Sequence, residues 1–487
     1  MTPTCERLSD HVLDVPVVCC CRDLQVLPQV LRQPRGDLLP IRCHGASLLA
    51  SSMGVEAFGD NWVNPLLLYA SPSYPEHSQD QQQGDPMPPS DHDDSPHVGV
   101  GERLRRVRKR RRNLTQAGLA ERSAVSRSYI AQIEAGHRIP SPAVTVALAN
   151  GLRVDITELT GQPYRGTTPS GDRVHEMIPD VRRALTYIDL PPDFDIPPRS
   201  LDDLATEVEQ LRQLSKAARH TQVGARLPAL IEELTHHALE HGLSRAWGLL
   251  NGAQALAVSL CRRLGYNDLA FVAIERATAS AARSEDPNLP HVARLSRALL
   301  MMTVGSWKPG LRLVQRASDG LDTTTTSGSA VAGALHLRAA VLSARASEAA
   351  TAWEHHGLAV DAAHTLPAHS PDFYALQFGS ANVAIHGCAV AVELEDHDEA
   401  LRRDRALRLP PQLAAERRAH HEIDMARAHV EVGQPRRALD RILNAERVAP
   451  QMARYHPSAV NVITYLVDWH RTLPETLCGI SSRMHIA

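Results

Sequence analysis

Hydrophobic positions recur at helical spacing over most of this chain, and between residues 101 and 161 they predict five short helices. We expect these helices at 102–112, 116–122, 127–135 and 142–150, with a fifth between Asp155 and about residue 161. Thr115 and Ser126 are suited to accept backbone hydrogen bonds at helix starts, and Gly136 and Gly151 are typical of the position just past a helix end.

Helical periodicity resumes after a Gly, Pro and Thr-rich joint at 161–171, with candidate helices at 174–187, 201–217 and 227–239. A repeat of about 40 residues follows, in which small residues return at similar places, namely Ala270, Gly310, Ala349, Ala400 and Ala438. Small residues let two helices approach, and this period is typical of stacked helical hairpins. The pattern predicts an all-α chain that ends in an α-solenoid.

Residues 1–99 show neither the hydrophobic period of a helix nor the alternation of a strand. The stretch SPSYPEHSQDQQQGDPMPPSDHDDSPH is acidic and Pro-rich, a composition that does not offset the entropy of ordering, so we expect a disordered extension. A further hypothesis is that translation starts at Met87, which would make residues 1–86 upstream sequence. The expected organisation is a disordered extension at 1–99, a helical domain at 100–161, a linker at 162–172 and helical repeats at 173–478.

Composition supports a helical chain of several domains. With 487 residues, a prior of about 150 per domain suggests roughly three segments. Hydrophobic residues make up 43% and aromatics only 4%, which favours cores of Ala, Leu and Val between helices. The net charge is −3, yet residues 101–140 hold eleven Arg or Lys against three Glu. A basic patch on short helices favours binding to nucleic acid.

The segment LTQAGLAERSAVSRSYIAQIEAGHRIPS, within 101–161, resembles the Cro/C1 (XRE) type of helix-turn-helix domain. Its spacing predicts a small core in which two helices cross, made of Leu119, Ala120, Val125, Ile130 and Ile133. This leaves Arg127, Ser128 and Gln132 at the exposed start of the second motif helix, which enters the major groove in such domains. Arg127 suits guanine and Gln132 suits adenine.

The resemblance also implies residues that contact the DNA backbone and one acid, Glu134, with a structural role. The backbone candidates are Gln116, Tyr129, Arg105, Lys109, Arg112 and Arg138. Two positions depart from the family pattern. Ala124 stands where a turn glycine is usual, which costs on the order of 1 kcal/mol of stability if the turn needs positive φ. Gly118 lies inside the first motif helix, which it weakens by about 1 kcal/mol relative to alanine.

Residues 428–450, AHVEVGQPRRALDRILNAERVAP, resemble a tetratricopeptide repeat, and the whole architecture resembles a group of actinobacterial regulators. The resemblance implies a homodimer and a concave groove for a peptide, a small molecule or a partner protein. An alternative is that the repeats serve dimerisation alone. The aromatic-rich stretch 373–382 is a candidate wall of an effector site. The alternative is that its aromatic side chains only fill the junction between two helical hairpins.

Motifs of catalysis are not found. HEIDM at 421–425 lacks the second histidine of a zinc helix. The paired histidines, among them His236, His355, His356 and His420, are expected to be exposed, and Cys261, Cys388 and Cys478 to be buried thiols. We therefore expect no metal or other cofactor, no enzymatic activity and no membrane association, and a cytoplasmic location.

The hypothesis that fits these patterns is a sequence-specific transcriptional regulator that binds double-stranded DNA as a homodimer. Its repeats would dimerise the protein and sense an effector. The alternative is an interaction scaffold whose DNA-binding domain has degenerated, as Ala124 and Gly118 would permit.

Overall fold

The computed structural model describes residues 42–43, 46–47, 99–111, 114–164, 169–367, 369–470 and 472–486, and of residues 42–43, 46–47 and 169–172 only the backbone. The chain divides into two compact units, Met1–Ser90 and Asp91–Ala487. In the first, β1 (Arg42–Cys43) pairs antiparallel with β2 (Ala46–Ser47), Arg42 opposite Ser47. The predictions of disorder at 1–99 and of a start at Met87 otherwise lie outside the described residues.

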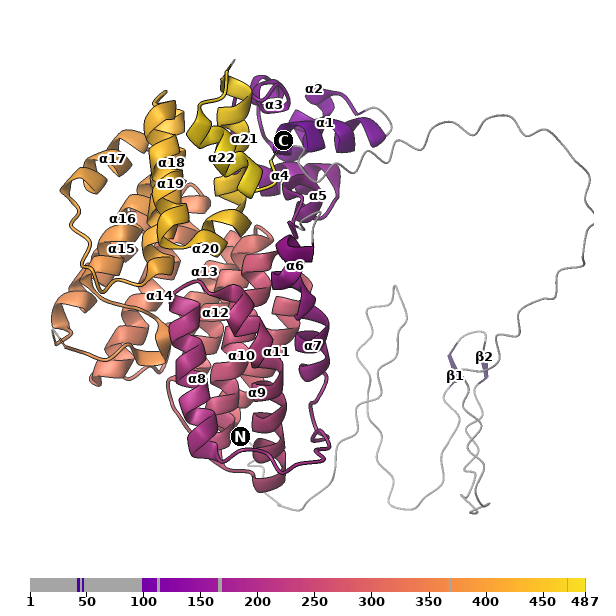
Figure 1. The fold of residues 1–487 in the computed structure, drawn as a ribbon, viewed down its shortest axis with the longest axis vertical. Helices are drawn as coiled ribbons and strands as arrows, with labels where there is room; N and C mark the ends of the chain where they lie inside the picture. Colours follow the sequence, from indigo (N-terminus) through magenta and orange to yellow (C-terminus); the bar gives the residue numbers. More distant parts are fainter. Residues whose placement is uncertain are drawn as a thin grey trace, which may run out of the picture. The chain divides into compact units, whose positions relative to one another are not determined.

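The described part of the second unit is all-helical, and it begins with a domain of five short helices (Figure 1). They are α1 (Val100–Arg110), α2 (Gln116–Ser123), α3 (Arg127–Glu134), α4 (Pro142–Leu152) and α5 (Ile156–Thr160). The predicted cap residues Thr115 and Ser126 each accept a backbone N–H with their side chains, and Ser141 and Asp155 do the same at α4 and α5.

The predicted end of α4 at Gly151 is wrong, because the helix continues through Gly151 to Leu152 and ends at Arg153, whose φ is 56°. The reason is a close approach between helices. A Cβ atom at Gly151 would lie 3.0 Å from Cβ of Ser123 and 3.2 Å from Cδ1 of Leu119. Gly151 therefore lets α2 pack tightly against α4 rather than ending the helix.

Four helices lead into the repeats: α6 (Pro169–Glu176), α7 (Ile178–Ala184), α8 (Leu201–Lys216) and α9 (His220–His241). The single helix expected at 174–187 is divided at Met177, because Pro179 in the first turn of α7 cannot continue the backbone bonding of α6. The helix expected at 227–239 starts earlier, at His220, since Val223 is buried in the same core as Leu227.

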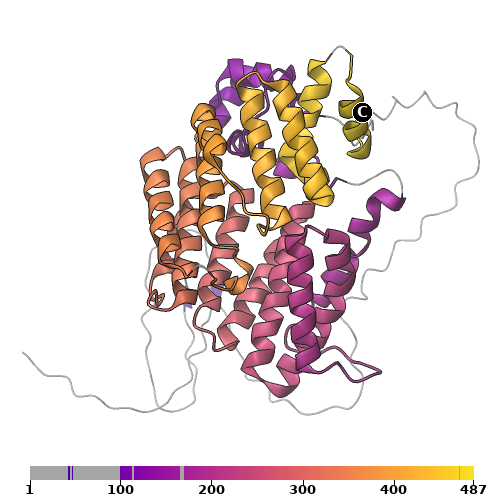
Figure 2. The same ribbon diagram turned by 60° about the vertical axis from the view of Figure 1, so that its left-hand side comes forward.

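Five helical hairpins follow and stack side by side (Figure 2). Their helices are α10 (Ser244–Leu264) with α11 (Asn267–Arg283), α12 (Leu289–Thr303) with α13 (Trp307–Ser318), α14 (Thr326–Arg345) with α15 (Ala349–Thr365), α16 (Ser380–Glu393) with α17 (His397–Ala406), and α18 (Ala415–Glu431) with α19 (Pro435–Val448). A 3-10 turn η2 (Phe373–Ala375) precedes α16, and α20 (Pro450–Tyr455), α21 (Pro457–Trp469) and α22 (Glu475–Arg483) complete the described chain.

The small residues that mark the repeat fall in the second helix of each hairpin. Ala270, Ala400 and Ala438 are fully buried there, and Gly310 is buried as well. The mark at Ala349 is wrong by one helical turn: Ala349 is exposed, and Ala352 is the buried small residue of α15. With this correction each hairpin has a buried small residue in its second helix, at the period that the sequence predicted.

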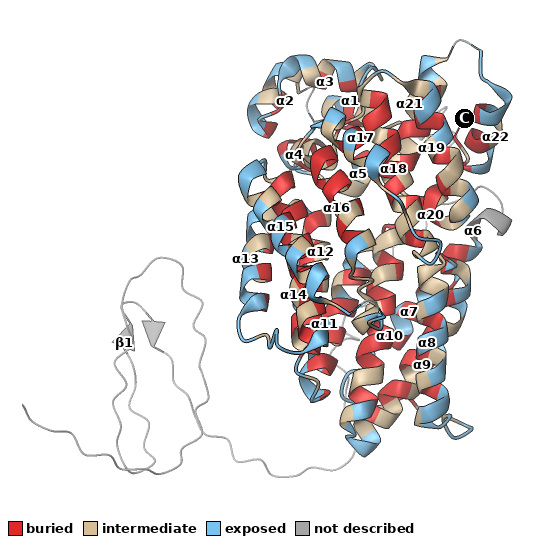
Figure 3. Cartoon of the chain, turned by 90° about the vertical axis from the view of Figure 1, so that its left-hand side faces the viewer, coloured by how far each residue is buried: buried red, intermediate tan, exposed pale blue. Residues whose placement is uncertain are grey.

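The first helices of the hairpins line the inner side of the stack and form a closed ring. Each of α10, α12, α14 and α16 contacts the next first helix along the chain, and α18 returns to contact α8. Buried positions concentrate between the helices, and exposed positions on the outer surface and the turns (Figure 3). Phe373–Glu393 is apolar and long enough to cross a membrane, but it is broken at Gly379, and eight of the fourteen residues of α16 are buried.

The helix-turn-helix domain rests on this ring at two places. The α3–α4 connection packs Ile139 against the C-terminal core of α18, α19 and α21. On the other side α4 meets the α12–α13 turn, where Gly305 has a φ of 72° and leaves no room for a Cβ beside Val146. A side chain at Gly305 would clash with α4 and strain the turn, so glycine at this position permits the contact between α4 and the repeats.

Candidate nucleic-acid interface

The turn between α2 and α3 fixes the angle at which α3 is presented. Ala124 takes the left-handed conformation, with φ 55° and ψ 23°, and Ser123 Oγ bonds the carbonyl oxygen of Leu119 at 2.8 Å. At the start of α3, Ser126 Oγ accepts the N–H of Tyr129 at 3.2 Å. The turn therefore has the positive φ that usually favours glycine, and this chain forms it with alanine.

The expected motif core is packed as the spacing requires. Leu119 and Ile130 are fully buried, Ile133 and Val125 are buried, and Ala120 lies half-buried against the same cluster. Leu104 and Val107 of α1 close this core from the other side. The inward face of α3 is thereby committed to packing, and its orientation about its own axis is set.

Arg127, Ser128 and Gln132 all lie on the opposite, exposed face of α3. Ser128 Oγ lies 3.2 Å from Ser126 Oγ, next to the first turn of the helix. Neither Arg127 nor Gln132 has a hydrogen bond or ion pair within the described part of the chain, and the repeat array does not cover them. The three expected base-reading side chains, the guanidinium of Arg127, the hydroxyl of Ser128 and the amide of Gln132, therefore lie on the exposed surface.

A half-buried ion pair holds the three helices of the site together. Arg108 of α1 makes two bonds to Glu134 of α3, Nε to Oε1 at 2.6 Å and Nη2 to Oε2 at 2.7 Å. Gln116 of α2 donates its amide to Glu134 Oε2 at 2.9 Å. Burial alone would raise the pKa of Glu134, but the hydrogen bonds from Arg108 and Gln116 hold it below its usual value.

The expected backbone contacts separate into three groups. Arg105 and Lys109 are exposed on α1, whereas Gln116 is turned toward Glu134. Arg112 lies outside the described residues. Tyr129 and Arg138 face the repeats: the Arg138 guanidinium lies 5.3 Å from the centre of the Tyr129 ring, and its Nη2 lies 3.5 Å from Glu431 Oε2 at the end of α18.

Sequence reasoning missed the role of Glu431, because an acid on a helix of the repeats shows no local signal of contact with α3. Burial raises the pKa of the Glu431 carboxyl, and the nearby charge of Arg138 opposes that rise. Burial also raises the pKa of the Tyr129 hydroxyl, and Glu395 and Glu431 add to the rise. These acids place negative charge at the edge of the expected DNA surface.

The expectations for histidine and cysteine are met only in part. The expected exposure of the paired histidines is wrong. His356 is buried, with Nε2 3.0 Å from the carbonyl oxygen of Val383, because α15 packs this side against α16, and His236, His355 and His420 are half-buried. Cys261 and Cys388 are buried thiols, whereas Cys478 is exposed on α22. Within the described residues no group of His, Cys, Asp or Glu side chains is arranged to hold a metal ion.

Comparison with known proteins agrees with this geometry. Residues 104–159 match the helix-turn-helix family model. The chain is also 40% identical over 63 residues to an immunity repressor protein of Bacillus phage phi105. That alignment covers 13% of the present chain and 43% of the repressor, so the chain spans less than half the length of this relative. No solved structure matches the chain. Residues 104–159 are a helix-turn-helix domain of the Cro/C1 type.

Proposed function

We propose that this protein is a sequence-specific DNA-binding transcriptional regulator in which α3 enters the major groove of an operator. The observation that carries the proposal is the exposed face of Arg127, Ser128 and Gln132 on a helix whose other face is fixed by a buried core. The similarity of this domain to a phage immunity repressor supports it.

In this proposal the three exposed side chains divide the reading of bases between them. Arg127 can donate two hydrogen bonds to guanine, and Gln132 can donate and accept with adenine. Ser128 can bond either a base or a phosphate. Each bidentate contact contributes about 1–3 kcal/mol of discrimination between bases. Arg105 and Lys109 of α1 contribute attraction to phosphates that does not depend on sequence and weakens with salt.

We further propose that the protein acts as a homodimer. A single domain of this kind covers about one half-site, and a two-fold partner would add a second at one helical turn or a multiple of it. The hairpins, which we take to be tetratricopeptide-like as in the actinobacterial regulators that the chain resembles, supply a large helical surface for dimerisation and an interior for an effector.

The proposal is tested by the binding of the full-length protein to a fragment of its own promoter at about 150 mM salt, where non-specific binding is weak. Fluorescence anisotropy should give a Kd for this fragment at least about a hundredfold lower than for a scrambled duplex of equal length. Arg127→Ala should remove most of that preference. Arg436→Ala, which removes an exposed arginine from α19 of the repeats, should leave it unchanged.

The second candidate is an interaction scaffold with a degenerate DNA-binding domain. The left-handed alanine at position 124 favours it, because a strained turn of this kind lowers the stability of the α2–α3 unit. In this case the protein would bind promoter and scrambled duplexes equally, and Arg127→Ala would have no effect on the ratio of the two Kd values.

A further inference from the structure

The ring of inner helices encloses a cavity of about 470 Å³. Its wall comes from α8, α10, α12, α14, α16 and α18, and one side is closed by the helix-turn-helix domain through Ile139, Thr145, Val146 and Ile156. A volume of this size is typical of sites for small molecules and is too small for a folded partner. The cavity therefore favours one of the effector classes that the sequence left open.

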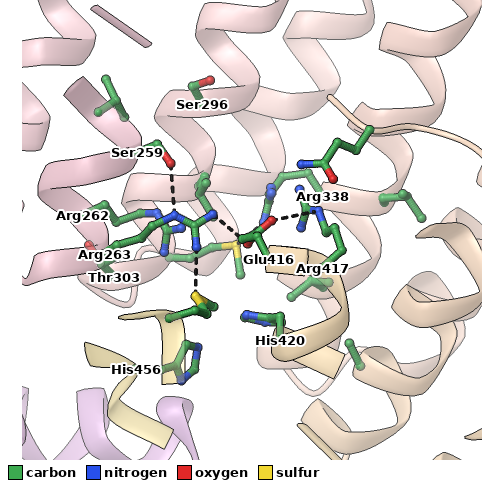
Figure 4. Close-up of a pocket in the computed structure, with 18 of the residues that line it drawn as sticks. Ser259, Arg262, Arg263, Ser296, Thr303, Arg338, Glu416, Arg417, His420 and His456 are labelled. Carbon is green, nitrogen blue, oxygen red and sulfur yellow. Dashed lines mark hydrogen bonds and ion pairs between the residues drawn. The ribbon is translucent and has the colours of Figure 1, made fainter. Parts of the chain in front are cut away.

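The wall of the cavity has a strong excess of positive charge. Eight lysine and arginine side chains line it, against three carboxylates, Glu393, Glu416 and Asp424. Several of the basic groups come together from different helices at one place, as Figure 4 shows for Arg262 and Arg263 of α10, Arg338 of α14 and Arg417 of α18.

The three carboxylates are already occupied by other basic side chains. Glu416 pairs with Arg263 at 2.6 Å and with Arg417 at 3.5 Å. Glu393 pairs with Arg345 at 3.0 Å and with Arg427 at 3.1 Å, and Arg427 also reaches Asp424 at 3.4 Å. No carboxylate of the wall is left to compensate the remaining arginines.

Among the arginines of the wall, Arg262 and Arg338 have no carboxylate partner within the described residues. The Nε atom of each is buried and has no hydrogen-bond partner, and Arg338 reaches only the sulfur of Met302, at 3.4 Å from Nη1. Burial, together with the charges of neighbouring basic groups such as Arg417, lowers the pKa of each to about 9. Both side chains are half-buried and stay charged at neutral pH, and charges withdrawn from water are normally paired in proteins.

Several other polar atoms of the wall also lack a hydrogen-bond partner among the described residues, and two of them belong to fully enclosed side chains. His220 and Asn382 are only 2% and 3% exposed, and neither His220 Nε2 nor Asn382 Oδ1 has a hydrogen bond within the described chain. The wall also contains apolar side chains, among them Leu256, Leu295 and Ile385, and Leu376 and Phe378 from the segment expected to form an effector wall. A wall that combines apolar side chains with a few polar groups is typical of a site for a small molecule.

We propose that this cavity binds a small organic anion, whose carboxylate or phosphate group pairs with Arg262 and Arg338 and whose apolar body lies against the leucine-rich wall. Arginine pairs with either group through two parallel hydrogen bonds. The proposal rests on the proposed function, since it names the class of effector. Of the three classes of effector that the sequence left open, a peptide, a small molecule and a partner protein, the proposal selects the small molecule.

The position of the cavity connects such a ligand to DNA binding. Thr145 and Val146 of α4 belong to its wall, and α4 packs directly against α2 of the DNA-binding motif. An anion that draws Arg262 and Arg338 together changes the surface on which α4 rests. The ligand thereby shifts the orientation of the helix-turn-helix domain relative to the ring, and with it the spacing of the two reading helices in a dimer.

The test measures binding to the full-length protein without DNA, with octanoate, octyl phosphate and the uncharged octan-1-ol as probes. A ligand that binds only the folded state stabilises it by RT ln(1 + L/Kd), where L is the free ligand concentration, so the unfolding temperature rises as this concentration exceeds Kd. We expect both anions, or one of them, to raise the unfolding temperature and octan-1-ol to have no effect. A shift with octyl phosphate alone assigns a phosphate group, and a shift with octanoate alone assigns a carboxylate.

The variants Arg338→Met and Arg262→Gln should weaken binding of the active anion at least tenfold, whereas Arg436→Ala should bind like the wild type. Arg338→Met should also unfold at the same temperature as the wild type or higher in the absence of ligand, because it removes an unpaired buried charge. This separates loss of the site from loss of the fold. Equal shifts with octan-1-ol and the anions, no shift with either anion, or unchanged binding by both variants would overturn the proposal.

A second measurement separates this proposal from the proposed function. The active anion should change the Kd for the promoter fragment by about fivefold or more, and Arg338→Met should abolish that change while keeping the Kd without ligand. If the protein binds its operator specifically but binds no anion, the proposed anion site is wrong and the proposed regulator function is supported. If it binds the anion but shows no specific DNA binding, the proposed function is wrong and the anion site is supported.

Discussion

Arg108 and Glu134 form a bidentate ion pair between α1 and α3, with N to O distances of 2.6 and 2.7 Å and side-chain exposures of 11% and 5%. The same carboxylate receives the amide of Gln116. Three helices of the helix-turn-helix domain thus meet at one acid near the end of α3. This pair is the main polar determinant of how α3 sits in the domain.

Glu134→Gln should therefore destabilise the domain, because Arg108 would keep its charge in a half-buried place without its partner. We expect a loss of about 2–3 kcal/mol in the opening free energy of α1 and α3. Hydrogen exchange of the amides of α1 and α3 in the full-length protein measures this directly. Glu102→Gln breaks an exposed pair with Arg106 in the same domain and should cost less than about 0.5 kcal/mol. Equal losses in the two variants would contradict the role of the pair.

Ala124→Gly should stabilise the α2–α3 turn, because the φ of 55° costs alanine on the order of 1 kcal/mol and glycine almost nothing. Protection of the α2 and α3 amides against hydrogen exchange should rise accordingly. Ala131→Gly, inside α3, is the matched control and should lower protection by a similar amount, since glycine weakens a helix interior. A decrease in both variants would show that the turn is not strained.

The contact of Arg138 with Glu431 predicts opposite effects on DNA affinity. Glu431→Gln should tighten binding to any duplex, because it removes negative charge beside α3 and releases Arg138 for phosphate. Arg138→Ala should weaken binding and reduce the slope of log Kd against log salt by about one. Titrations at several salt concentrations measure both. Glu446→Gln, which breaks the distant pair with Arg483, should change neither quantity.

The buried His220 and the half-buried His386 predict a loss of stability at mildly acidic pH. Burial lowers the pKa of His220 and of His386 from 6.5 to about 3 in the folded protein. The unfolded chain therefore takes up these protons first, and stability falls as the pH drops from about 6.5 toward 3, by up to about 1.4 kcal/mol per pH unit for each histidine. Glu393, whose pKa is held at about 2, contributes only below its ordinary value of 4.5.

The unfolding temperature measured between pH 7.5 and 5 tests this directly. His386→Gln should flatten the curve, whereas His364→Asn, which replaces an exposed histidine of α15, should leave its slope unchanged. A wild-type curve that stays level down to pH 5 would mean that these histidines are accessible to protons in the folded state.

Local patterns were sufficient to predict the helices of the DNA-binding domain and the hairpins of the repeats. Thr115 and Ser126 cap helices through atoms only a few residues away, and the small residues Ala270 and Ala438 mark helix crossings within one hairpin. Such contacts are encoded by nearby residues, so periodicity and capping rules capture them. The same holds for the separation of α3 into a buried and an exposed face.

Features that join distant parts of the chain could not be predicted in this way, because they depend on how successive hairpins turn relative to one another. Examples are the contact of α18 with α8 that closes the ring, the contact of α4 with Gly305, and the presence of Arg262 and Arg338 in one cavity wall. Gly151 shows the limit within one domain, because a glycine that is typical of a helix end serves close packing instead.

The central claim, that α3 reads bases, is tested most directly by selecting binding sites from a pool of random duplexes with the wild type, Arg127→Ala and Lys109→Ala. We expect the wild type to select a two-fold operator, and Arg127→Ala to lose preference at one base position in each half-site. Lys109→Ala should keep the same preferences with a uniformly weaker Kd. Selection of the same sequence by wild type and Arg127→Ala, with the same discrimination at every position, would contradict the assignment of the reading helix.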